Sequence, residues 1–334
     1  MSPARTPSLI VGAGLMGRHH ARSAASAGAA IVGIVDRDFE AAKSLARQWH
    51  GATAAAELKE ALNSRDAAVV HICTPAATHA EIARTAADAG CHALIEKPLG
   101  ETVHDARQIH EHFLRAQKLA CPTHQYAFQR AVIAASRGSQ RLGRVRHVAF
   151  EICSAGAAAG HISPDVLIAE ILPHPLSILQ QLLPSIDLPK LDWTCIRAAP
   201  GEWLVAANAG GVLLTISLSA NGRPTRFLSQ IIGEAGSIEI DHFHDFAVVL
   251  PGGVSRSRKI LAPFVHSGRE LTAAAGNLVG RAARGEFAYP GLRKLVGDFY
   301  RAVRKPGSPP PITPEQSIAV AAARDRIIGL ANHG

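Results

Sequence analysis

The stretch Leu9-Ile10-Val11-Gly12-Ala13-Gly14-Leu15-Met16-Gly17 decides how the N-terminal third of this chain folds. Its three apolar residues predict a buried strand, and the glycine pattern predicts that this strand turns directly into a helix. Gly12 permits the tight turn, Gly14 lets the backbone approach a pyrophosphate, and Gly17 lets helix and strand pack closely. The N–H groups at the helix start then bind the phosphates. The stretch therefore predicts a dinucleotide site.

A second strand and an acidic residue complete this pattern. The apolar run of residues 31–35 ends in Asp36, about twenty residues after the last glycine, where the ribose-binding acid belongs. A carboxylate there binds the ribose hydroxyls and repels a 2′-phosphate, so NAD is the expected cofactor. Arg37 leaves NADP open, because its guanidinium could stack on adenine or pair with that phosphate.

Strands and helices alternate from residue 8 to about residue 123. The predicted helices cover residues 15–27, 39–49, 77–89 and 103–117, and the strands after the first cover 31–35, 67–73, 93–95 and 119–121. This alternation predicts an α/β fold, a doubly wound parallel sheet with helices on both faces. Ligands of such a sheet bind at the carboxyl ends of its strands.

Two further strand ends carry polar residues. Cys73-Thr74-Pro75 and, four residues on, His79 follow one strand, and Glu96-Lys97-Pro98 follows the next. A lysine directly after a buried strand, at the mouth of a nucleotide site, is poorly explained as solvated surface. Its ammonium group could hydrogen-bond a substrate oxygen and exchange a proton with it, with Glu96 orienting it.

The pattern changes after residue 122. Helices are predicted over 129–137 and 166–183, a loop over 154–160, and strands over 146–151, 191–198, 203–208, 212–219, 226–232, 237–240 and 246–250. Consecutive strands without intervening helices predict an antiparallel sheet, and hence a separate α+β domain. Another subunit could cover its open face, so we expect a homodimer or homotetramer formed through this sheet.

The remainder is a turn-rich stretch followed by helices. Residues 251–263 are poorly periodic, and helices are predicted over 270–283 and 292–303. After the proline-rich linker 306–312, Thr313 as N-cap, Pro314 at the first position and Gln316 at the third predict a helix to about residue 331. The predicted domains are therefore 1–123 for the dinucleotide, 124–310 for substrate and oligomerisation, and 311–334 as a helix returning to the first domain.

Composition limits the classes of function. The 334 residues are 47% hydrophobic and 19% charged, as in an ordinary globular protein. No apolar run reaches membrane-spanning length, and no secretory signal is visible. Five cysteines, far apart and odd in number, favour a reduced, cytoplasmic protein. The net charge of +8 is scattered and accompanied by few aromatic residues, so we expect a small-molecule substrate rather than nucleic acid or a membrane as partner.

Four motifs together resemble the glucose-fructose oxidoreductase / inositol dehydrogenase (Gfo/Idh/MocA) family. They are Gly12-x-Gly14-x-x-Gly17, Cys73-Thr74-Pro75-x-x-x-His79, Glu96-Lys97-Pro98-Leu99 and Gly233-Glu-Ala-Gly236-Ser237, in the family's order. The resemblance implies a Rossmann domain followed by a domain with a large, mostly antiparallel sheet. It also implies an NAD(P)-dependent dehydrogenase or reductase of sugars, cyclitols or related small molecules. We expect the cofactor to contact Gly12, Gly14, Leu15, Met16, Gly17, Asp36, Arg37, Cys73, Thr74, Pro75, His79, Glu96 and Lys97.

The resemblance also implies catalytic residues. Lys97 would contact the substrate, and Pro98, which can follow a cis peptide bond, would shape the site near the nicotinamide. The family's Asp-x-Gly-x-His-x-x-Asp helix reads Glu170-Ile-Leu-Pro-His174-Pro-Leu-Ser177 here. His174 matches, Glu170 replaces the first acid, and the two would share a helix face unless the two prolines disturb it. We therefore expect Lys97, His174 and Glu170 to be catalytic.

Departures from that motif leave other functions open. Leu172 replaces the family's glycine and Ser177 its second acid, which fits a reductase of an imine or enone on a less polar metabolite. A dinucleotide-binding regulator without catalytic activity is a further alternative. Nicotinamide turnover would distinguish an enzyme from such a regulator. His242 and His244, beside Asp241 and Asp245, could form a metal pair but are interpreted as a polar edge, so no metal is expected.

Overall fold

The computed structural model of the protein describes residues 5–64, 66–153, 162–253, 255–286 and 288–333. The chain forms two compact units. The first unit contains Met1–His124 and Leu292–Ala321, and the second contains Gln125–Gly291 and Ala322–Gly334. The chain therefore passes from one unit to the other three times, whereas the predicted boundaries imply two passages. Within the described residues, no helix is long and apolar enough to cross a bilayer.

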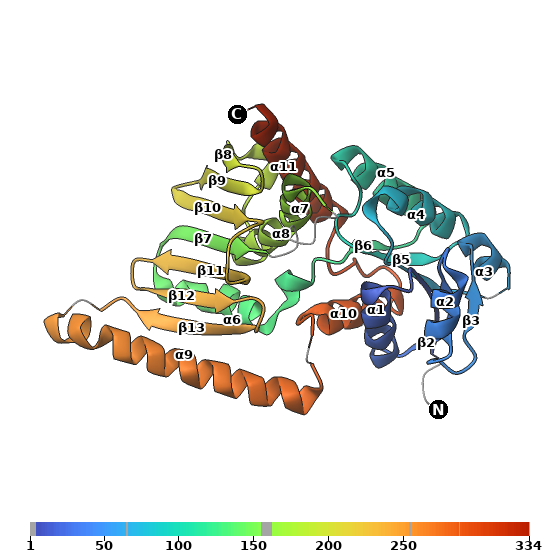
Figure 1. Cartoon of the computed structure of the whole chain (residues 1–334), viewed down its shortest axis with the longest axis horizontal. Helices are drawn as coiled ribbons and strands as arrows, with labels where there is room; N and C mark the ends of the chain where they lie inside the picture. Colours follow the sequence, from blue (N-terminus) through green and yellow to red (C-terminus); the bar gives the residue numbers. More distant parts are fainter. Residues whose placement is uncertain (1–4, 65, 155–161, 254, 287, 334) are drawn as a thin grey trace. The chain divides into compact units, whose positions relative to one another are not determined.

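The first unit is built on a six-stranded sheet in the order β3-β2-β1-β4-β5-β6, with every pair of neighbours parallel. Its strands are β1 (Thr6–Val11), β2 (Ala29–Val35), β3 (Thr53–Ala55), β4 (Val69–Ile72), β5 (His92–Ile95) and β6 (Ala120–Pro122). They alternate with α1 (Leu15–Ser26), α2 (Phe39–Ala46), α3 (Leu58–Ser64), the 3-10 turn η1 (Ala76–Thr78), α4 (His79–Asp88) and α5 (Val103–Arg115). Figure 1 shows α4 and α5 on one face of this sheet and α1 on the other. The predicted doubly wound parallel sheet is confirmed.

The central strands of this sheet are buried on both faces. Leu9, Ile10, Val70, Ile72 and Ile95 are all fully buried. This is why these strands are continuous apolar runs rather than alternating ones. Each such side chain contributes about 1.5–3 kcal/mol when it is taken out of water. β3 and α3 were not predicted, because β3 is a run of only three small residues.

The C-terminal part of the first unit consists of α10 (Leu292–Val303) and the first half of α11 (Pro314–His333). α10 packs on α1, and Leu295, Val296, Phe299 and Tyr300 are fully buried. The predicted boundaries place residues 292–310 in the second domain. The apolar face of α10 explains why they cluster with the first unit instead.

The start of α11 has the predicted geometry. The Thr313 hydroxyl accepts a hydrogen bond from the Gln316 amide at 3.3 Å, and the Gln316 side chain accepts one from the Thr313 amide at 3.0 Å. This reciprocal cap confirms the predicted helix start. Ser317, Val320, Ala323 and Ile327 along the helix are buried.

The second unit is built on a seven-stranded sheet in the order β13-β12-β11-β7-β10-β9-β8. Its strands are β7 (Val145–Cys153), β8 (Thr194–Ala199), β9 (Glu202–Ala209), β10 (Val212–Ser219), β11 (Arg226–Gly233), β12 (Gly236–Asp241) and β13 (Phe246–Pro251). Only the pairing of β7 with β10 is parallel, which confirms a mostly antiparallel sheet. The remaining elements before α10 are η2 (Gln125–Phe128), α6 (Arg130–Gly138), η3 (Ser139–Leu142), α7 (Pro164–Ile171), α8 (Pro173–Leu182), η5 (Leu188–Lys190) and α9 (Arg256–Arg284).

Two predictions for the second unit were wrong in detail. The helix predicted over 166–183 is divided at Leu172, because Pro173 and Pro175 have no N–H to continue the hydrogen-bond ladder. Most of the stretch predicted to be turn-rich belongs instead to α9, a helix of 29 residues with Pro263 inside it. Figure 1 shows α9 running beside β13 at the edge of the sheet. Residues 155–160 of the predicted loop lie outside the described residues.

Candidate dinucleotide-binding and active site

The glycine stretch forms the turn between β1 and α1, and two of its glycines have no room for a side chain. Gly12 has a φ of +98°, and a Cβ there would lie 2.6 Å from the Cys73 carbonyl oxygen. A Cβ on Gly17 would lie 1.8 Å from the Gly12 carbonyl oxygen. A Cβ on Gly14 would meet no atom within 4 Å, so the backbone at this position faces open space. This is the cradle that a pyrophosphate group requires.

A pocket of about 580 Å³ opens in front of this turn. Its volume is within the usual range of small-molecule and cofactor sites. Seven of the predicted cofactor-binding residues line it together: Gly12, Gly14, Asp36, Arg37, Cys73, Thr74 and Pro75. They come from the ends of β1, β2 and β4, which agrees with ligand binding at the carboxyl ends of parallel strands.

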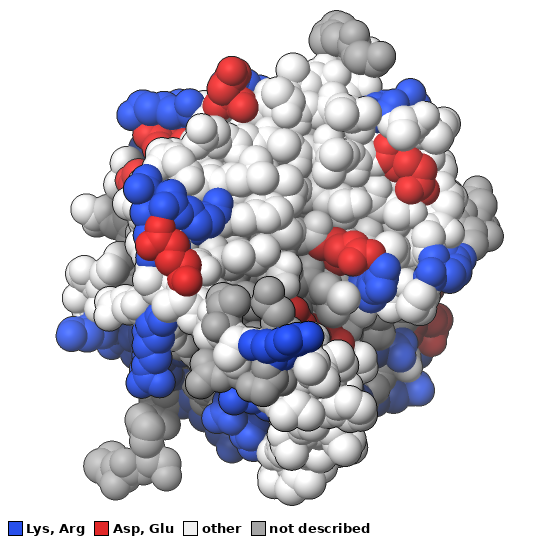
Figure 2. All heavy atoms as spheres, turned by 90° about the vertical axis from the view of Figure 1, so that its left-hand side faces the viewer, with Lys and Arg blue, Asp and Glu red and all other residues white. Residues whose placement is uncertain are grey.

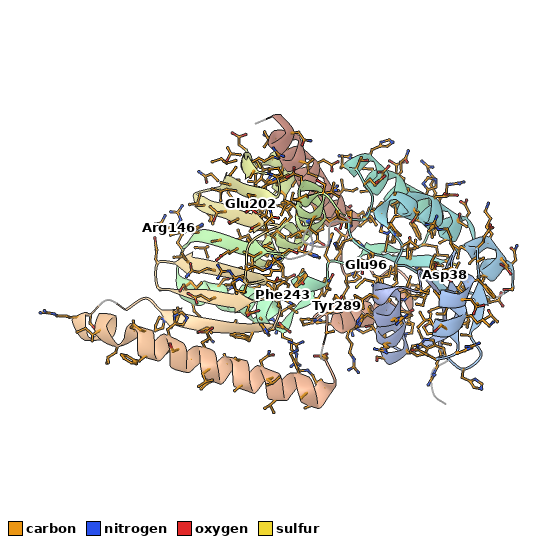
Figure 3. The ribbon with its side chains drawn as sticks, in the orientation of Figure 1. Asp38, Glu96, Arg146, Glu202, Phe243 and Tyr289 are labelled. Atoms are coloured by element: carbon orange, nitrogen blue, oxygen red, sulfur yellow. The ribbon has the colours of Figure 1, made fainter. Side chains whose placement is uncertain are left out.

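Asp36 connects two of those strand ends. Its Oδ2 accepts a hydrogen bond from the Ala13 amide at 2.7 Å, and its Oδ1 accepts one from the Asp38 amide at 2.9 Å. Asp38, labelled in Figure 3, in turn caps α2 by accepting from the Ala41 amide. The half-buried Asp36 carboxylate is thus fixed at the wall of the pocket, where it can accept hydrogen bonds from ribose hydroxyls.

Residues after β3 and on α4 complete the pocket and were missed from the sequence. They are Ala56, Glu57, Leu58 and Lys59 after β3, and Thr78, Glu81, Ile82 and Thr85 before or on α4. The strand that places the first group is too short to be seen as an apolar run. Lys59 adds a second cationic side chain to Arg37 beside Asp36.

The other predicted cofactor residues do not line this pocket. Leu15 and Met16 begin α1, and Leu15 is 63% exposed. His79 is buried and connects two strand ends, since its ring nitrogens lie 2.9 Å from the Pro98 carbonyl oxygen and 2.8 Å from the Thr74 carbonyl oxygen. Because carbonyl oxygens only accept, a ring nitrogen that carries a proton donates in such a contact. His79 therefore braces the two loops that carry Thr74 and Lys97.

Glu96 and Lys97 follow β5, where Figure 3 marks Glu96. Glu96 is buried; its Oε1 lies 2.9 Å from His20 Nε2, and its Oε2 accepts from the Lys97 amide at 3.2 Å. Burial alone would raise the pKa of Glu96, but the hydrogen bond and charge of His20, with those of Lys97, outweigh it and lower that pKa. Glu96 is therefore a carboxylate beside Lys97. The Lys97–Pro98 peptide bond is cis, as the resemblance implied.

Glu170 and His174 belong to the second unit and lie on either side of the break between α7 and α8. His174 is buried, and its ring makes an edge contact with Tyr126 at 4.6 Å between centroids. The Ser177 hydroxyl donates to the His174 carbonyl oxygen at 2.9 Å. Leu172 between the two helices keeps helical backbone angles (φ −48°, ψ −38°), so a shared face of Glu170 and His174 stays a prediction.

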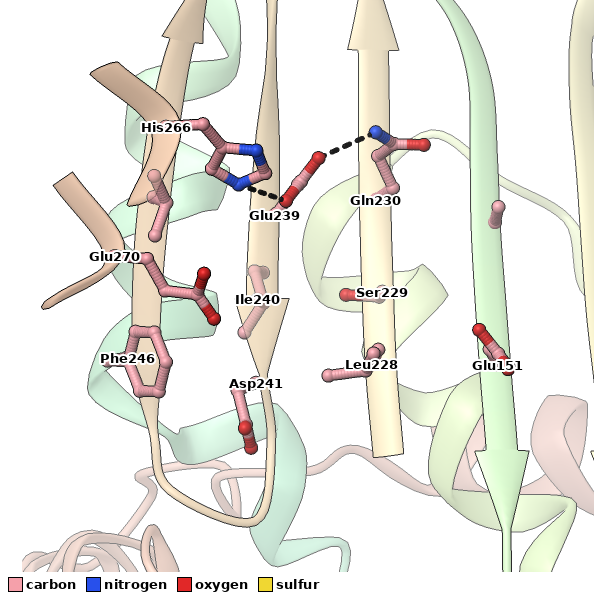
Figure 4. A pocket seen from close by; sticks show the side chains of 12 residues that line it. Glu151, Leu228, Ser229, Gln230, Glu239, Ile240, Asp241, Phe246, His266 and Glu270 are labelled. Carbon is pink, nitrogen blue, oxygen red and sulfur yellow. Dashed lines mark hydrogen bonds and ion pairs between the residues drawn. The ribbon is translucent and has the colours of Figure 1, made fainter. Parts of the chain in front are cut away.

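A smaller pocket of about 340 Å³ lies in the second unit between the sheet and α9 (Figure 4). One of its carboxylates, Glu239, lies 3.0 Å from His266 and 3.0 Å from Gln230. His242, one of the candidate metal ligands, is bonded instead to Gln129 and Ser229. Nowhere in the described ranges do three or more His, Cys, Asp or Glu side chains gather as a metal site.

The fold and the pocket define the first unit as a dinucleotide-binding Rossmann unit. Residues 8–124 match the family described as "Oxidoreductase family, NAD-binding Rossmann fold", GFO_IDH_MocA. This match to an NAD-binding family agrees, over the first unit, with the resemblance found in the sequence.

Similar proteins of known activity are dehydrogenases. The chain is 31% identical over 135 residues to 4-carboxy-2-hydroxymuconate-6-semialdehyde dehydrogenase of Sphingobium sp. (strain NBRC 103272 / SYK-6), covering 37% of this chain and 42% of that one. It is 34% identical over 102 residues to inositol 2-dehydrogenase of Arthrobacter sp. (strain FB24), covering 30% of each. The matched regions thus span less than half of the curated relatives.

One solved structure shares the fold over nearly the whole chain. UDP-N-acetylglucosamine 3-dehydrogenase GnnA from Acidithiobacillus ferrooxidans has a TM-score of 0.76 at 17% identity, covering 98% of each chain. At this identity the likeness concerns the fold alone.

Proposed function

We propose that the chain is an NAD-dependent oxidoreductase that moves a hydride between nicotinamide and a carbinol or carbonyl carbon of a sugar, cyclitol or related metabolite. The observation that carries this proposal is the pocket where Gly12, Gly14 and Asp36 meet at the strand ends of a Rossmann sheet. Bound NAD would supply the hydride chemistry. Nicotinamide absorbance, followed while candidate sugars, cyclitols and their oxo forms are added, tests the activity.

The chain's own residues would handle the proton and the developing charge. Lys97 directly follows β5, with the Glu96 carboxylate accepting from its amide at 3.2 Å. Its ammonium group would hydrogen-bond the substrate oxygen and stabilise charge as hydride moves. We assign His174 as the proton carrier and Glu170 as a second substrate contact.

A reductase of an imine or enone on a less polar metabolite is the second candidate. Leu172, which replaces the family's glycine, is fully buried beside His174, and the His174 ring lies against Tyr126. These apolar neighbours favour a less polar substrate than a polyol. A non-catalytic regulator is the remaining alternative, and failure of every substrate class in the turnover assay would favour it.

The cofactor preference gives a first quantitative prediction. The Asp36 carboxylate, fixed by two backbone amides, should repel a 2′-phosphate, so NADH should bind about tenfold or more tightly than NADPH. Asp36→Ser should lower this ratio, because Arg37 and Lys59 then stand beside the ribose without the opposing charge. Fluorescence titration with both reduced cofactors measures the ratio.

Glu57→Gln is the matched control, since Glu57 is another carboxylate of the same pocket. It should leave the ratio near the wild-type value. Tighter binding of NADPH than of NADH by the wild-type protein would contradict the assignment to Asp36.

We also propose that a second copy of the chain covers α9 and the open face of the seven-stranded sheet. The polar side of α9 contacts its own sheet edge, with Arg281 donating to the His244 carbonyl oxygen at 3.0 Å and His266 paired with Glu239. Phe264, Leu271 and Leu278, spaced by seven residues, are instead 68–77% exposed. Figure 2, which faces the left-hand side of Figure 1, shows broad areas without charged residues. An apolar stripe facing away from its own unit requires a partner.

The exposed area fits a second copy. Seven large apolar side chains of α9 are each about half to three quarters exposed: Ile260, Leu261, Phe264, Val265, Leu271, Leu278 and Val279. Together they offer several hundred Å², on the order of the roughly 800 Å² per partner in a standard interface. Ile196, Leu204 and Leu213 on the sheet are also exposed and would extend it. A two-fold interface would bury both sets at once.

Leu271→Glu should therefore convert the oligomer into a monomer of 35.2 kDa. A buried carboxylate without a partner is costly at an apolar interface. Light scattering after gel filtration measures the mass, with circular dichroism to check folding. Leu114→Glu, at a 77% exposed position of α5 in the first unit, is the control and should leave the mass unchanged. A wild-type protein that runs as a monomer at micromolar concentration would refute the interface.

The cysteines fit a reducing compartment such as the cytoplasm. All five are free thiols, and burial raises the pKa of Cys73 and of Cys91, which keeps both as unreactive thiols.

A further inference from the structure

A chain of buried hydrogen bonds runs from Glu96 through the interior of the first unit to α10. Glu96, His20, His71, Tyr300 and Ser8 follow one another along it, and all are buried. Glu96 follows β5, and the others come from α1, β4, α10 and β1, in that order. None of these five residues lines the cofactor pocket. Polar groups buried this deeply are costly unless every one is satisfied, so the direction of each bond can be worked out.

The far end of the chain has two possible directions. The Ser8 hydroxyl has one proton and two neighbours, the Thr6 carbonyl oxygen at 3.1 Å, which only accepts, and the Tyr300 hydroxyl at 2.7 Å, which can donate or accept. When Ser8 donates to Thr6, the Tyr300 hydroxyl donates to Ser8. Its oxygen then accepts from His71 Nε2 at 2.8 Å. The His71 proton is thus on Nε2.

The proton positions at the Glu96 end follow from the position of the His71 proton. Burial, and then the charge of His20, lower the pKa of His71 well below its ordinary value, so His71 is neutral and its Nδ1 is an acceptor. His20 Nδ1, 3.0 Å away, donates to it. His20 Nε2 donates to Glu96 at 2.9 Å. In this direction both ring nitrogens of His20 donate, which places a cation beside the buried Glu96 carboxylate.

We propose that the chain Ser8–Tyr300–His71 is a positioning device that fixes a positive charge on His20. This charge keeps Glu96 ionised, and ionised Glu96 holds the Lys97 amide through its second oxygen. The inference rests on the proposed function only in taking Lys97 as the residue that contacts substrate. Ser8 and Tyr300 act through the other members of the chain and touch no reactant.

The other charged and titratable groups near this hydrogen-bond chain lie at its two ends. The Arg304 guanidinium lies 5.9 Å from the centre of the Tyr300 ring, at the far end of the chain. Near Glu96, burial lowers the pKa of His124 to about 4 and raises that of Cys73, so both are neutral at pH 7. The remaining charged or titratable neighbours are Lys97 beside Glu96 and His19 and Arg22 on α1 beside His20.

Nitrogen-15 NMR of the histidine-labelled protein, without cofactor or substrate, tests the proposal. At pH 7.5 His20 should show two protonated ring nitrogens, with its signals identified by their loss in His20→Gln. Tyr300→Phe removes the acceptor of His71 Nε2–H, so the His71 proton should move to Nδ1 and His20 should lose its own Nδ1 proton. Ser8→Ala, at the other end, should do the same because Tyr300 then donates to His71. Either variant suffices if the other does not fold.

Phe299→Leu is the matched control, since Phe299 is buried next to Tyr300 but has no polar atom. It should keep the wild-type His20 signals. A singly protonated His20 in the wild type, an unchanged His20 in both chain variants, or the same change in the control would each overturn the proposal. None of these outcomes depends on finding a substrate, so they are separate from a failure of the proposed function.

The pH profile gives a second readout. The pKa of Glu96 is lowered in the folded protein, so its charge is present at neutral pH and is lost as pH falls through that lowered value. Without the charge on His20 this pKa should rise. In Tyr300→Phe the acid limb of kcat/KM should therefore move to higher pH by about one unit or more, the shift expected for loss of a neighbouring opposite charge. An unmoved acid limb with normal folding would oppose the proposal.

Discussion

Replacing Lys97 with alanine is expected to lower turnover about a hundredfold or more, on the scale of losing one electrostatic donor to the transition state. Cofactor affinity should change little, because Lys97 does not line the pocket formed by Gly12, Gly14 and Asp36. Steady-state rates on the identified substrate and NADH titration of the same preparation measure the two quantities separately.

His174→Ala should reduce turnover about ten- to a thousandfold and flatten the pH profile, as expected for loss of a proton carrier. The two losses should not add in the double variant, because both residues act on one proton transfer. Lys43→Ala is the control for charge, since Lys43 is paired with Glu40 on α2. Near-normal turnover of Lys97→Ala, or loss of its cofactor binding, would show that Lys97 is a cofactor or structural residue.

Deleting residues 313–334 is expected to lower the melting temperature by about 10 °C or more. The deletion removes α11, in which Val320, Ala323, Ile327 and Ala331 are buried. Large apolar side chains such as Val320 and Ile327 contribute about 1.5–3 kcal/mol each, and one kcal/mol corresponds to about 2–4 °C in a domain of this size. Differential scanning calorimetry of both proteins measures the change.

A chain that ends at Asn332 is the control, because it keeps every one of those buried side chains. It should melt at the wild-type temperature. A protein without residues 313–334 that also melts there would mean that α11 adds nothing to either unit.

The parts of the fold that could be predicted are those set by local pattern. The glycine turn, the alternating elements of the first sheet and the cap at Thr313 follow from residues close together in the sequence. β3 was missed because three small residues give no periodic signal. The first part of α9 was missed because Pro263 lies inside it and proline usually ends a helix. The cofactor pocket was predicted only where a strand end carries a motif.

The hydrogen-bond chain behind Glu96 could not be predicted. Ser8 precedes an apolar run, His71 interrupts another, and Tyr300 follows Phe299 on a helix, so no local pattern indicates their partners. Ser8 and Tyr300 are 292 positions apart and meet only when α10 packs on α1. Such contacts cannot be predicted from local sequence patterns, because the residues that make them lie far apart in the chain.

The return of residues 292–321 to the first unit has a consequence for biosynthesis. A ribosome makes β1 first, yet the helix that buries the Tyr300 end of its polar chain emerges only after the whole second unit has been synthesised. Until then Ser8 and His71 have no tyrosine to bond, and the α1 surface that receives α10 is open to water. We therefore expect the nascent first unit to remain incomplete, and to be exposed to proteases and chaperones, until α10 has left the ribosome.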